Sequence, residues 1–295
     1  MSIVTRRNAL LALAAAGPPS CRAGEDVLRL GISESLVRDV SIADARAAMM
    51  VWMKRIAEDL RVDLRCVPEV FESQESLAAK LKQGLVDTVA MNLLEYRRLR
   101  EWLDPREITV PSQKTALRYV LLVRSDSGVA KVADLRGRRL LLLDSLQACI
   151  APAWLNTLIG AGGQESAGSF FSAVSRRPKP SQVILPVFFG QMEACLTTQL
   201  SFLTAGELNP QILSKLKPLT VSPEIVASLY AYRRGCPSNL RAKISRAMTG
   251  LASSPAGRQV LTLFQCESLL VRDISCLGDA LSILARDERG QGGSL

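Results

Sequence analysis

Apolar and polar residues follow two patterns along this chain, one typical of strands and the other of helices. A short apolar run over 27–32 predicts a first strand, and apolar residues three and four positions apart predict an amphipathic helix over 42–60. Further strands are predicted over 62–66, 85–91, 119–123, 140–143 and 225–232. Further helices are predicted over 73–83, around Trp154 up to Gly160, and from Ser254-Pro255 onward.

Strands and helices that alternate in this way predict an α/β fold with largely parallel sheets. In such folds the ligand sites lie beyond the carboxyl ends of the strands. Residues 161–180 are rich in Gly, Ser and Pro and are predicted to be a loop or insertion.

Two distant segments share one pattern. Gly84–Asn92 and Gly190–Thr198 each begin with a glycine after a helical stretch, followed by an apolar residue, an acid and an apolar strand. An apolar helix is predicted after each strand. The repetition predicts two similar α/β lobes, with the alternative that helix–glycine–strand is common in such proteins and recurs by chance.

The first 23 residues differ from the rest. Arg6-Arg7, an apolar run over 9–16 and the breakers Gly17-Pro18-Pro19 are typical of an export signal, cleaved after Ala23. The apolar run is too short to cross a bilayer. The alternative is a frayed N-terminal helix of a cytoplasmic protein.

The route of export stays open. Thr5-Arg6-Arg7-Asn8 is weakly similar to a twin-arginine signal, so twin-arginine and Sec export are both retained. Lipid attachment at Cys21 is disfavoured, because Pro18 and Pro19 stand where a lipobox has Leu and a small residue.

Composition excludes several functions. The 295 residues include no His, so neither a Ser-His-Asp or Cys-His nucleophile nor a His-ligated metal site can form. Cleavage of 1–23 would remove three of the 37 basic residues and none of the 28 acidic ones, lowering the formal charge from +9 to +6. This balance fits attraction of an anionic ligand or a membrane surface, and without a DNA- or RNA-reading element no nucleic-acid partner is expected.

The cysteines leave one question open. Cleavage would leave six, an even number that permits disulfides in an oxidising compartment. Cys66 and Cys195 lie in apolar strand-like runs and are interpreted as buried thiols. Cys266 and Cys276 are the one pair close in sequence, so a bridge between them is possible.

A resemblance to a known family begins at Tyr119–Gly128, a strand and turn that lead into Asp134-Leu135-Arg136-Gly137-Arg138. This run resembles the second-lobe entry of type 2 periplasmic solute-binding proteins, and Leu85–Tyr96 resembles their first-lobe segment. The likeness covers about residues 27–265 and is greatest to the phosphate/phosphonate-binding (PhnD-like) family of ABC transporter substrate-binding proteins.

The resemblance implies a two-lobed periplasmic-binding-protein-like fold of type 2, whose lobes close on a ligand about a two-segment hinge. The implied crossings are Pro111–Leu117 and Thr220–Pro223. Lobe 1 would then comprise 24–112 and 221–295, and lobe 2 would comprise 113–220. The resemblance also implies a monomer that works in the periplasm.

Family ligands are held by hydroxyls and backbone N–H groups at a helix start in the second lobe, a position that favours anions. The matching stretch is Asp144–Pro152, where only Ser145 and Gln147 could donate from side chains. Leu146, Ala148 and Cys149 stand at polar or glycine positions of the family. These replacements argue against a phosphonate, and a less charged or more apolar small molecule fits as well.

Other candidates follow strand ends, where a capping or loop role is the alternative for each, most clearly for Ser33 and Ser35. The family's acids that hold an ammonium group have no evident counterpart, since threonines fall at that strand end. The candidate ligand-binding residues are Ser33, Glu34, Ser35, Phe71, Met91, Asn92, Ser145, Gln147, Thr197 and Thr198.

The function we expect is that of an exported, non-enzymatic solute-binding protein that uses no cofactor or metal and serves an ABC-type membrane transporter. A protein that presents its ligand to a membrane sensor is an alternative. An enzyme on the same scaffold would have to use Asp144 near Cys149, where no suitable base adjoins the thiol. A regulatory effector domain would need a DNA-binding module, for which residues 1–26 are too short.

Overall fold

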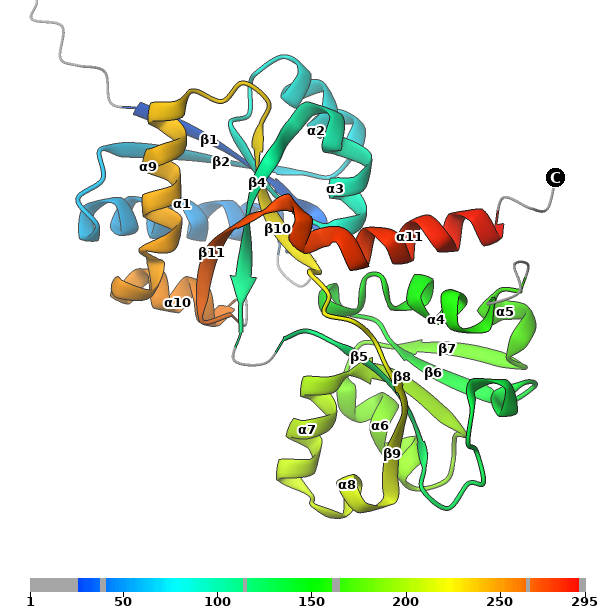
Figure 1. Ribbon diagram of the computed structural model, residues 1–295. Coiled ribbons are helices and arrows are strands. Elements are labelled where there is room, and N and C mark those ends of the chain that lie inside the picture. The colour runs from blue at the N-terminus through cyan, green and yellow to red at the C-terminus, as the bar shows by residue number, and fades with distance from the viewer. Residues whose placement is uncertain (1–25, 38–40, 114–115, 161–164, 264–265, 292–295) are drawn as a thin grey trace, which may run out of the picture.

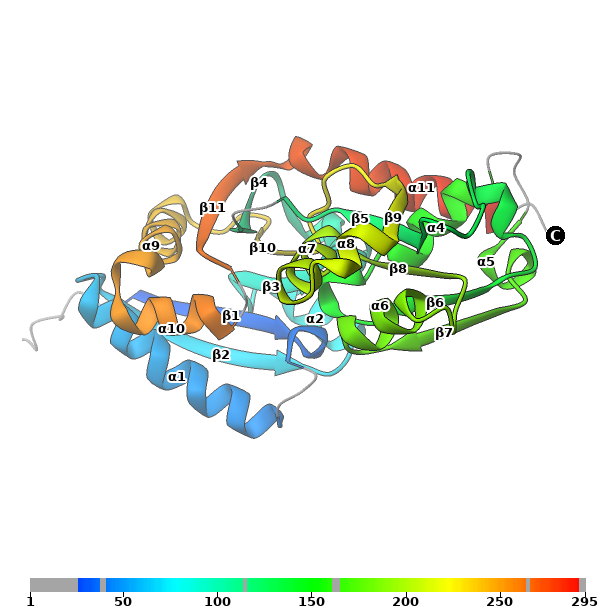
Figure 2. The same cartoon turned by 90° about the horizontal axis from the view of Figure 1, so that it is seen from below.

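A computed structural model describes residues 26–37, 41–113, 116–160, 165–263 and 266–291 (Figure 1). The chain forms two sheets that lie side by side, each covered by helices (Figure 2). This confirms the predicted two-lobed α/β fold. The expected export signal, with Cys21, lies outside the described residues. None of the helices in the described part is long and apolar enough to cross a membrane.

The first sheet, which we call the first lobe together with its helices, has six strands in the order β11-β4-β10-β3-β1-β2. Its strands are β1 (Asp26–Ser33), β2 (Leu64–Phe71), β3 (Thr88–Asn92), β4 (Leu103–Ser112), β10 (Ser228–Arg233) and β11 (Ser268–Asp273). Its helices are α1 (Ile42–Asp59), α2 (Gln74–Lys82), α3 (Leu93–Leu99), α9 (Ser238–Thr249) and α10 (Pro255–Leu263). Strands β1, β2 and β3 are parallel.

The second sheet, which with its helices forms the second lobe, has five strands in the order β7-β6-β8-β5-β9. Its strands are β5 (Tyr119–Arg124), β6 (Arg139–Leu143), β7 (Ala173–Arg177), β8 (Ala194–Thr198) and β9 (Leu216–Val221). Its helices are α4 (Ala151–Ile159), α5 (Ala167–Phe170), α6 (Pro180–Phe188), α7 (Gln199–Leu208) and α8 (Gln211–Lys215). Short 3-10 turns follow β1 and β6, namely η1 (Glu34–Leu36) and η4 (Leu146–Ala148), and another, η5 (Leu251–Ser253), links α9 to α10.

Period-two alternation in β1 separates the two faces of the first sheet. Leu28, Leu30 and Ile32 are buried together with apolar residues of α1 and α9. Arg29, between them, instead pairs with Asp87, which precedes β3. The first lobe therefore has one apolar core on the α1 and α9 side and another on the side of α2 and α3.

The last helix, α11 (Gly278–Gln291), joins the two lobes. It packs along α4 (Figure 1), and the Asn156 side chain of α4 donates a hydrogen bond to Asp287 at 2.8 Å. On its other side Glu288 forms an ion pair with Arg97 of α3. The C-terminal helix thus contacts the second lobe as well as the first.

Residues 161–180 differ from the predicted loop. Their described part holds α5, β7 and the start of α6. Strand β7 is an edge strand that pairs only with β6, and most of its side chains are exposed or half-buried. A solvated edge strand needs no apolar run, so its Ser and Arg residues resemble a loop in sequence.

Candidate functional site

The carboxyl ends of the parallel strands of both sheets face one another. The chain passes directly from β4 to β5 and from β9 to β10. Both passages therefore run between the same end of the first sheet and the same end of the second. At one edge Ser228 of β10 lies opposite Asn92 of β3. At the other edge Tyr119 of β5 lies opposite Thr198 of β8. This arrangement brings the strand ends of both sheets, where such sheets bind ligands, to the passages between the lobes.

A network of hydroxyls around one carboxylate forms the first-lobe wall of this site. The Ser33 and Ser35 hydroxyls donate to the two oxygens of Glu95 at 2.5 and 3.0 Å. The backbone N–H of Asn92 donates to the same carboxylate at 2.9 Å. Glu95 is buried, and among the described residues no Lys or Arg pairs with it.

The local sequence explains why this network forms. Asn92 ends β3 and caps α3, accepting from the Glu95 N–H at 2.9 Å, while the Glu95 side chain returns to the Asn92 N–H. This is a capping box, in which residues three apart satisfy each other's backbone donors. The Asn92 amide also donates to the Ser35 hydroxyl at 3.1 Å, which ties the cap to the β1–η1 turn.

Next to this network lies an open cavity of about 370 Å³. Three of its lining residues, Glu34, Glu72 and Glu95, are acids, and within the described part of the chain no basic side chain lines it. The remaining lining residues are hydroxyl, amide and apolar: Ser33, Ser35, Phe71, Ser73, Gln74 and Leu77. A wall of this composition attracts a cation or a hydrogen-bond donor.

The second-lobe edge is much less polar. Ser145 precedes η4, but its hydroxyl makes no capping hydrogen bond. The Gln147 carbonyl accepts from the Tyr119 hydroxyl at 2.9 Å, so this backbone oxygen is already engaged. Helix α4 starts after Ile150, a buried residue without a side-chain oxygen to cap the helix. The hydroxyl-rich helix start expected of the family is therefore absent from the described residues here.

Cys149 fills part of the space between the lobes. Its thiol lies 3.6 Å from the Ala227 carbonyl, in the passage from β9 to β10, and that carbonyl also accepts from the Leu93 N–H of α3. Burial raises the pKa of the Cys149 thiol to about 12, to which the nearby Glu95 adds. The thiol is protonated at neutral pH, and no hydrogen bond joins it to Asp144 among the described residues. Nucleophilic chemistry gains no support from this geometry.

The other described cysteines also have free thiols, including Cys266 and Cys276, so the possible bridge between these two is not present. Cys195 is fully buried in β8 and Cys66 largely buried in β2, in line with their strand patterns. No group of three or more acidic or Cys side chains in the described part of the chain could hold a metal ion.

The structure places some of the ten candidate residues at the cavity and others away from it. Ser33, Glu34, Ser35 and Phe71 line the cavity, and Asn92 adjoins it through Ser35. Ser145 and Gln147 lie at the facing edge of the second lobe.

Two further candidates have structural roles. Met91 has no exposed surface and packs in the core. Thr198 caps α7, accepting from the Ser201 N–H at 3.1 Å. Thr197 is buried, and its hydroxyl has no hydrogen-bond partner among the described residues. Strand ends thus supply cap and core residues as well as wall residues.

Sequence reasoning missed half of the cavity wall. Glu72, Ser73, Gln74, Leu77 and Glu95 line it but were not candidates. For Glu95 a signal existed, because Asn followed three residues later by Glu has the spacing of a capping box. Nothing in the sequence showed that the β2–α2 turn, which contains Glu72 and Ser73, would stand beside it.

Solved structures support the fold. XAC2383 from Xanthomonas citri bound to ATP shares 14% identity with a TM-score of 0.60, over 92% of this chain and 100% of that one. PhnD1 from Prochlorococcus marinus in complex with methylphosphonate shares 14% identity with a TM-score of 0.56, over 90% and 100%. A binding protein component of an ABC phosphonate transporter from Pseudomonas aeruginosa shares 12% identity with a TM-score of 0.55, over 91% and 88%. At these identities the likeness concerns the fold alone.

Family assignment rests on the sequence. No curated protein sequence matches the chain. Residues 37–270, however, match the family model described as ABC transporter, phosphonate, periplasmic substrate-binding protein. Because that model spans most of the sequence and its fold is the one observed, the chain belongs to this family of periplasmic solute-binding proteins.

Proposed function

We propose that this protein captures a small solute between its two lobes and delivers it to an ABC-type membrane transporter. The observation that carries the proposal is the cavity at the carboxyl edge of the first sheet, lined by the Ser33, Ser35 and Glu95 network and lying beside the passages between the lobes. The passages from β4 to β5 and from β9 to β10 would serve as the hinge about which the lobes close.

The cavity wall favours a ligand with an ammonium or another hydrogen-bond-donating group. The carboxylates of Glu34 and Glu72 can accept from a donor or a cation, whereas both oxygens of Glu95 already accept from Ser33, Ser35 and the Asn92 N–H. PhnD1 from Prochlorococcus marinus holds methylphosphonate, which carries no such group. For this chain we therefore favour an amine-bearing solute over a simple phosphonate.

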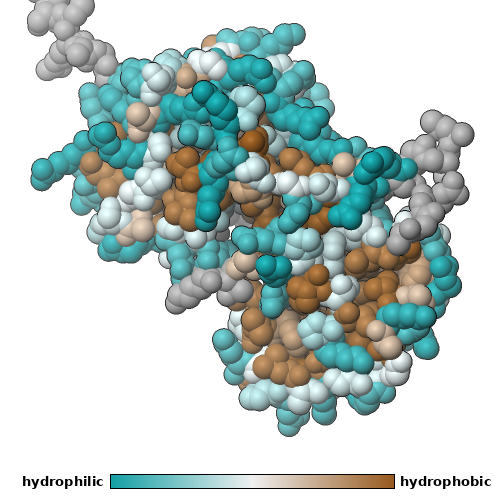
Figure 3. Space-filling view, in the orientation of Figure 1, coloured by the Kyte–Doolittle hydropathy of each residue, from teal (hydrophilic) through white to brown (hydrophobic). Residues whose placement is uncertain are grey.

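Surface apolarity on the second lobe supports a protein partner. Figure 3 shows apolar side chains at the surface of that lobe. Among its exposed apolar residues are Leu185 of α6, Leu200 and Leu208 of α7, and Leu213 of α8. Exposed apolar groups of this kind mark docking surfaces, and a membrane transporter is the partner that the family supplies.

A ligand panel tests the proposal. Thermal unfolding of the purified protein would be followed with phosphate, methylphosphonate, 2-aminoethylphosphonate, an alkyl sulfonate and amino acids. A ligand that binds only the native state raises the melting temperature with its concentration. We expect the amine-bearing compounds to stabilise the protein more than methylphosphonate does.

Two variants locate the binding site. Ser35→Ala removes a hydroxyl of the wall and should lower the affinity for the stabilising ligand roughly five- to tenfold. The matched control, Ser127→Ala, lies in the turn after β5, at the opposite edge of the second sheet, and should bind as the wild type does. Equal weakening in both variants would contradict the site, and no stabilisation by any compound would contradict solute capture.

A further inference from the structure

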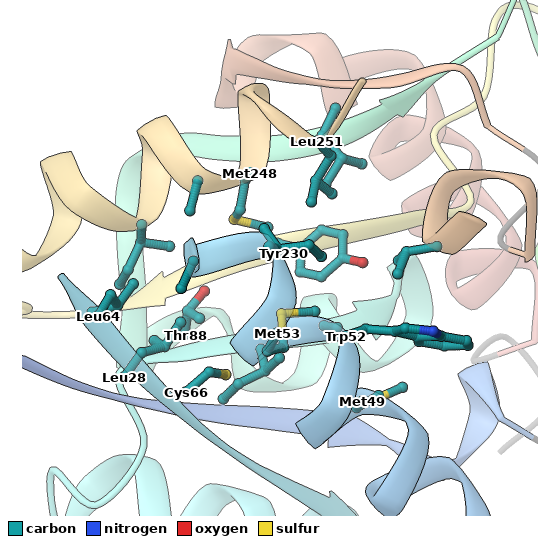
Figure 4. Close-up of a pocket in the computed structure, with 18 of the residues that line it drawn as sticks. Leu28, Met49, Trp52, Met53, Leu64, Cys66, Thr88, Tyr230, Met248 and Leu251 are labelled. Atoms are coloured by element: carbon teal, nitrogen blue, oxygen red, sulfur yellow. The ribbon is translucent and has the colours of Figure 1, made fainter. Parts of the chain in front are cut away.

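A second cavity lies inside the first lobe, on the face of the sheet that α1 and α9 cover (Figure 4). Its volume is about 70 Å³. Strands β1, β2, β3 and β10 form its floor, and α1, α9 and η5 form its walls. It shares no lining residue with the open cavity at the carboxyl edge of the first sheet.

The lining of this inner cavity is apolar apart from a few uncharged groups. Within the described part of the chain no acidic or basic side chain lines it. The Thr88 hydroxyl donates to the Ala231 carbonyl at 3.0 Å, so its proton is engaged and its oxygen can only accept. Tyr230 projects from β10 among the lining side chains (Figure 4), and its hydroxyl has no hydrogen-bond partner among the described residues. The cavity therefore offers one free hydroxyl within an apolar enclosure.

The walls can adapt to an occupant. Met49, Met53 and Met248 line the cavity, which is three of the seven methionines of the chain. Methionine side chains are flexible and polarisable and fill irregular spaces without strain. Trp52 lies beside Met53 on α1 and is only half-buried, so it adds an aromatic face to the enclosure.

The space holds more than one water but only about half the volume of an apolar cavity that binds benzene, so an aromatic occupant enters only where the methionine side chains move aside. A single water needs roughly 10–15 Å³ and two to four polar partners, whereas apolar cavities stay dry and bind small apolar molecules. An empty apolar cavity also destabilises a fold in proportion to its volume, so that a fitting occupant stabilises it. The size, the missing charges and the single hydroxyl together define the occupant.

We propose that this cavity is a second ligand site, for a small uncharged molecule that is mainly apolar and carries one hydrogen-bonding group directed at Tyr230. A phenol or an indole has this chemistry. The site is independent of the solute bound between the lobes, since it lies on the other face of the first sheet.

Thermal unfolding with phenol, indole and benzene tests the proposal. We expect phenol and indole to raise the melting temperature of the wild type saturably, with one site by calorimetry. Tyr230→Phe should lower the affinity for phenol about fivefold, because one hydrogen bond is lost, and leave the affinity for benzene unchanged. An equal effect on phenol and benzene would overturn the role of the hydroxyl.

Cavity-filling variants locate the site. Ala247→Leu extends into the cavity from α9 and should raise the melting temperature and abolish the response to all three probes. Ala242→Leu, on the exposed side of the same helix, should respond as the wild type does. Should Ala247→Leu fail to fold, Ala57→Leu on α1 fills the same space from the other wall. A wild type that shows no response, or filled variants that still respond, would overturn the proposal, whereas Ser35→Ala should leave the response intact.

Discussion

The two lobes contain equivalent strand–helix junctions. In each, a glycine with positive φ precedes the strand, Gly84 at 72° and Gly190 at 73°. An acid follows and pairs with an arginine of the neighbouring strand. Asp87 pairs with Arg29 at 2.6 Å in the first lobe. In the second lobe Glu193 pairs with Arg139 at 2.8 Å. The repeated sequence pattern thus reflects repeated structure.

The equivalent groups differ in their surroundings. The Asp87 side chain is 1% exposed, whereas that of Glu193, its counterpart in the second lobe, is 31% exposed. The cap of the first lobe, Asn92 with Glu95, is linked to a wall of hydroxyls and acids. The cap of the second lobe, Thr198 with Ser201, is a local contact. The same strand–helix junction therefore carries a wall of hydroxyls and acids in the first lobe and only a local helix cap in the second.

Removing the arginines should show the largest difference between the junctions. Arg29→Ala leaves the buried Asp87 carboxylate with Arg233, 4.0 Å away, and with the backbone N–H of residue 29, and should cost about 3 kcal/mol in the free energy of unfolding. Arg139→Ala leaves a partly exposed Glu193 and should cost about 0–1 kcal/mol. Urea unfolding of both variants measures the difference, and equal losses would refute the distinction between a buried and an exposed pair.

Alkaline pH should destabilise the protein through its buried thiols. Burial raises the pKa of Cys66 in the first lobe and of Cys149 in the second to about 12. An unfolded thiol has a pKa of about 8.5, so this stability is complete below that pH and is lost as pH rises towards 12. Each thiol should contribute a loss of about 1.4 kcal/mol per pH unit in that range.

Urea midpoints between pH 8 and pH 11 measure this slope. Cys195, in the second lobe, also has a raised pKa from burial. Replacing Cys149 and Cys195 together should therefore flatten the slope more than replacing Cys66. A slope unchanged by all three substitutions would assign the effect to other groups.

Removing the helix caps of the two lobes should change the free energy of unfolding by more similar amounts than removing the arginines does. Thr198→Ala removes one capping hydrogen bond and should cost about 1 kcal/mol. Asn92→Ala removes a cap and also the link to Ser35, and should cost about 2 kcal/mol. Equal losses in urea unfolding would mean that the wall adds nothing to the cap in the ligand-free protein.

Cys149→Ser should have the smallest effect. The serine hydroxyl can donate to the Ala227 carbonyl as the thiol does, so stability should change by less than about 1 kcal/mol. Solute binding should also persist, because the thiol is protonated at neutral pH and serves as packing between the lobes. Loss of binding with stability preserved would reveal a thiol role that this geometry does not support.

Much of the architecture could be predicted from the sequence. Apolar periodicity located α1, α2, α4 and several strands, because each of these elements has a strong apolar face or run, and the Ser254-Pro255 start signal located α10. Strands β4, β9 and β11 were not predicted. The edge strand β7 was missed, because its solvated side chains give no apolar signal. The predicted strand over 225–232 starts later, at Ser228, because the residues before it form the passage between the lobes.

The sequence by itself determined the two repeated α/β units, the family and the absence of histidine chemistry, since these depend on composition and on local periodicity. Only the tertiary structure decided which polar strand-end residues line the open cavity and which became caps or core. Glu95, Ser33 and Glu72 are distant in sequence and meet only because three parallel strands end at one edge. The inner cavity is likewise a property of packing between α1, α9 and the sheet, which no local pattern encodes.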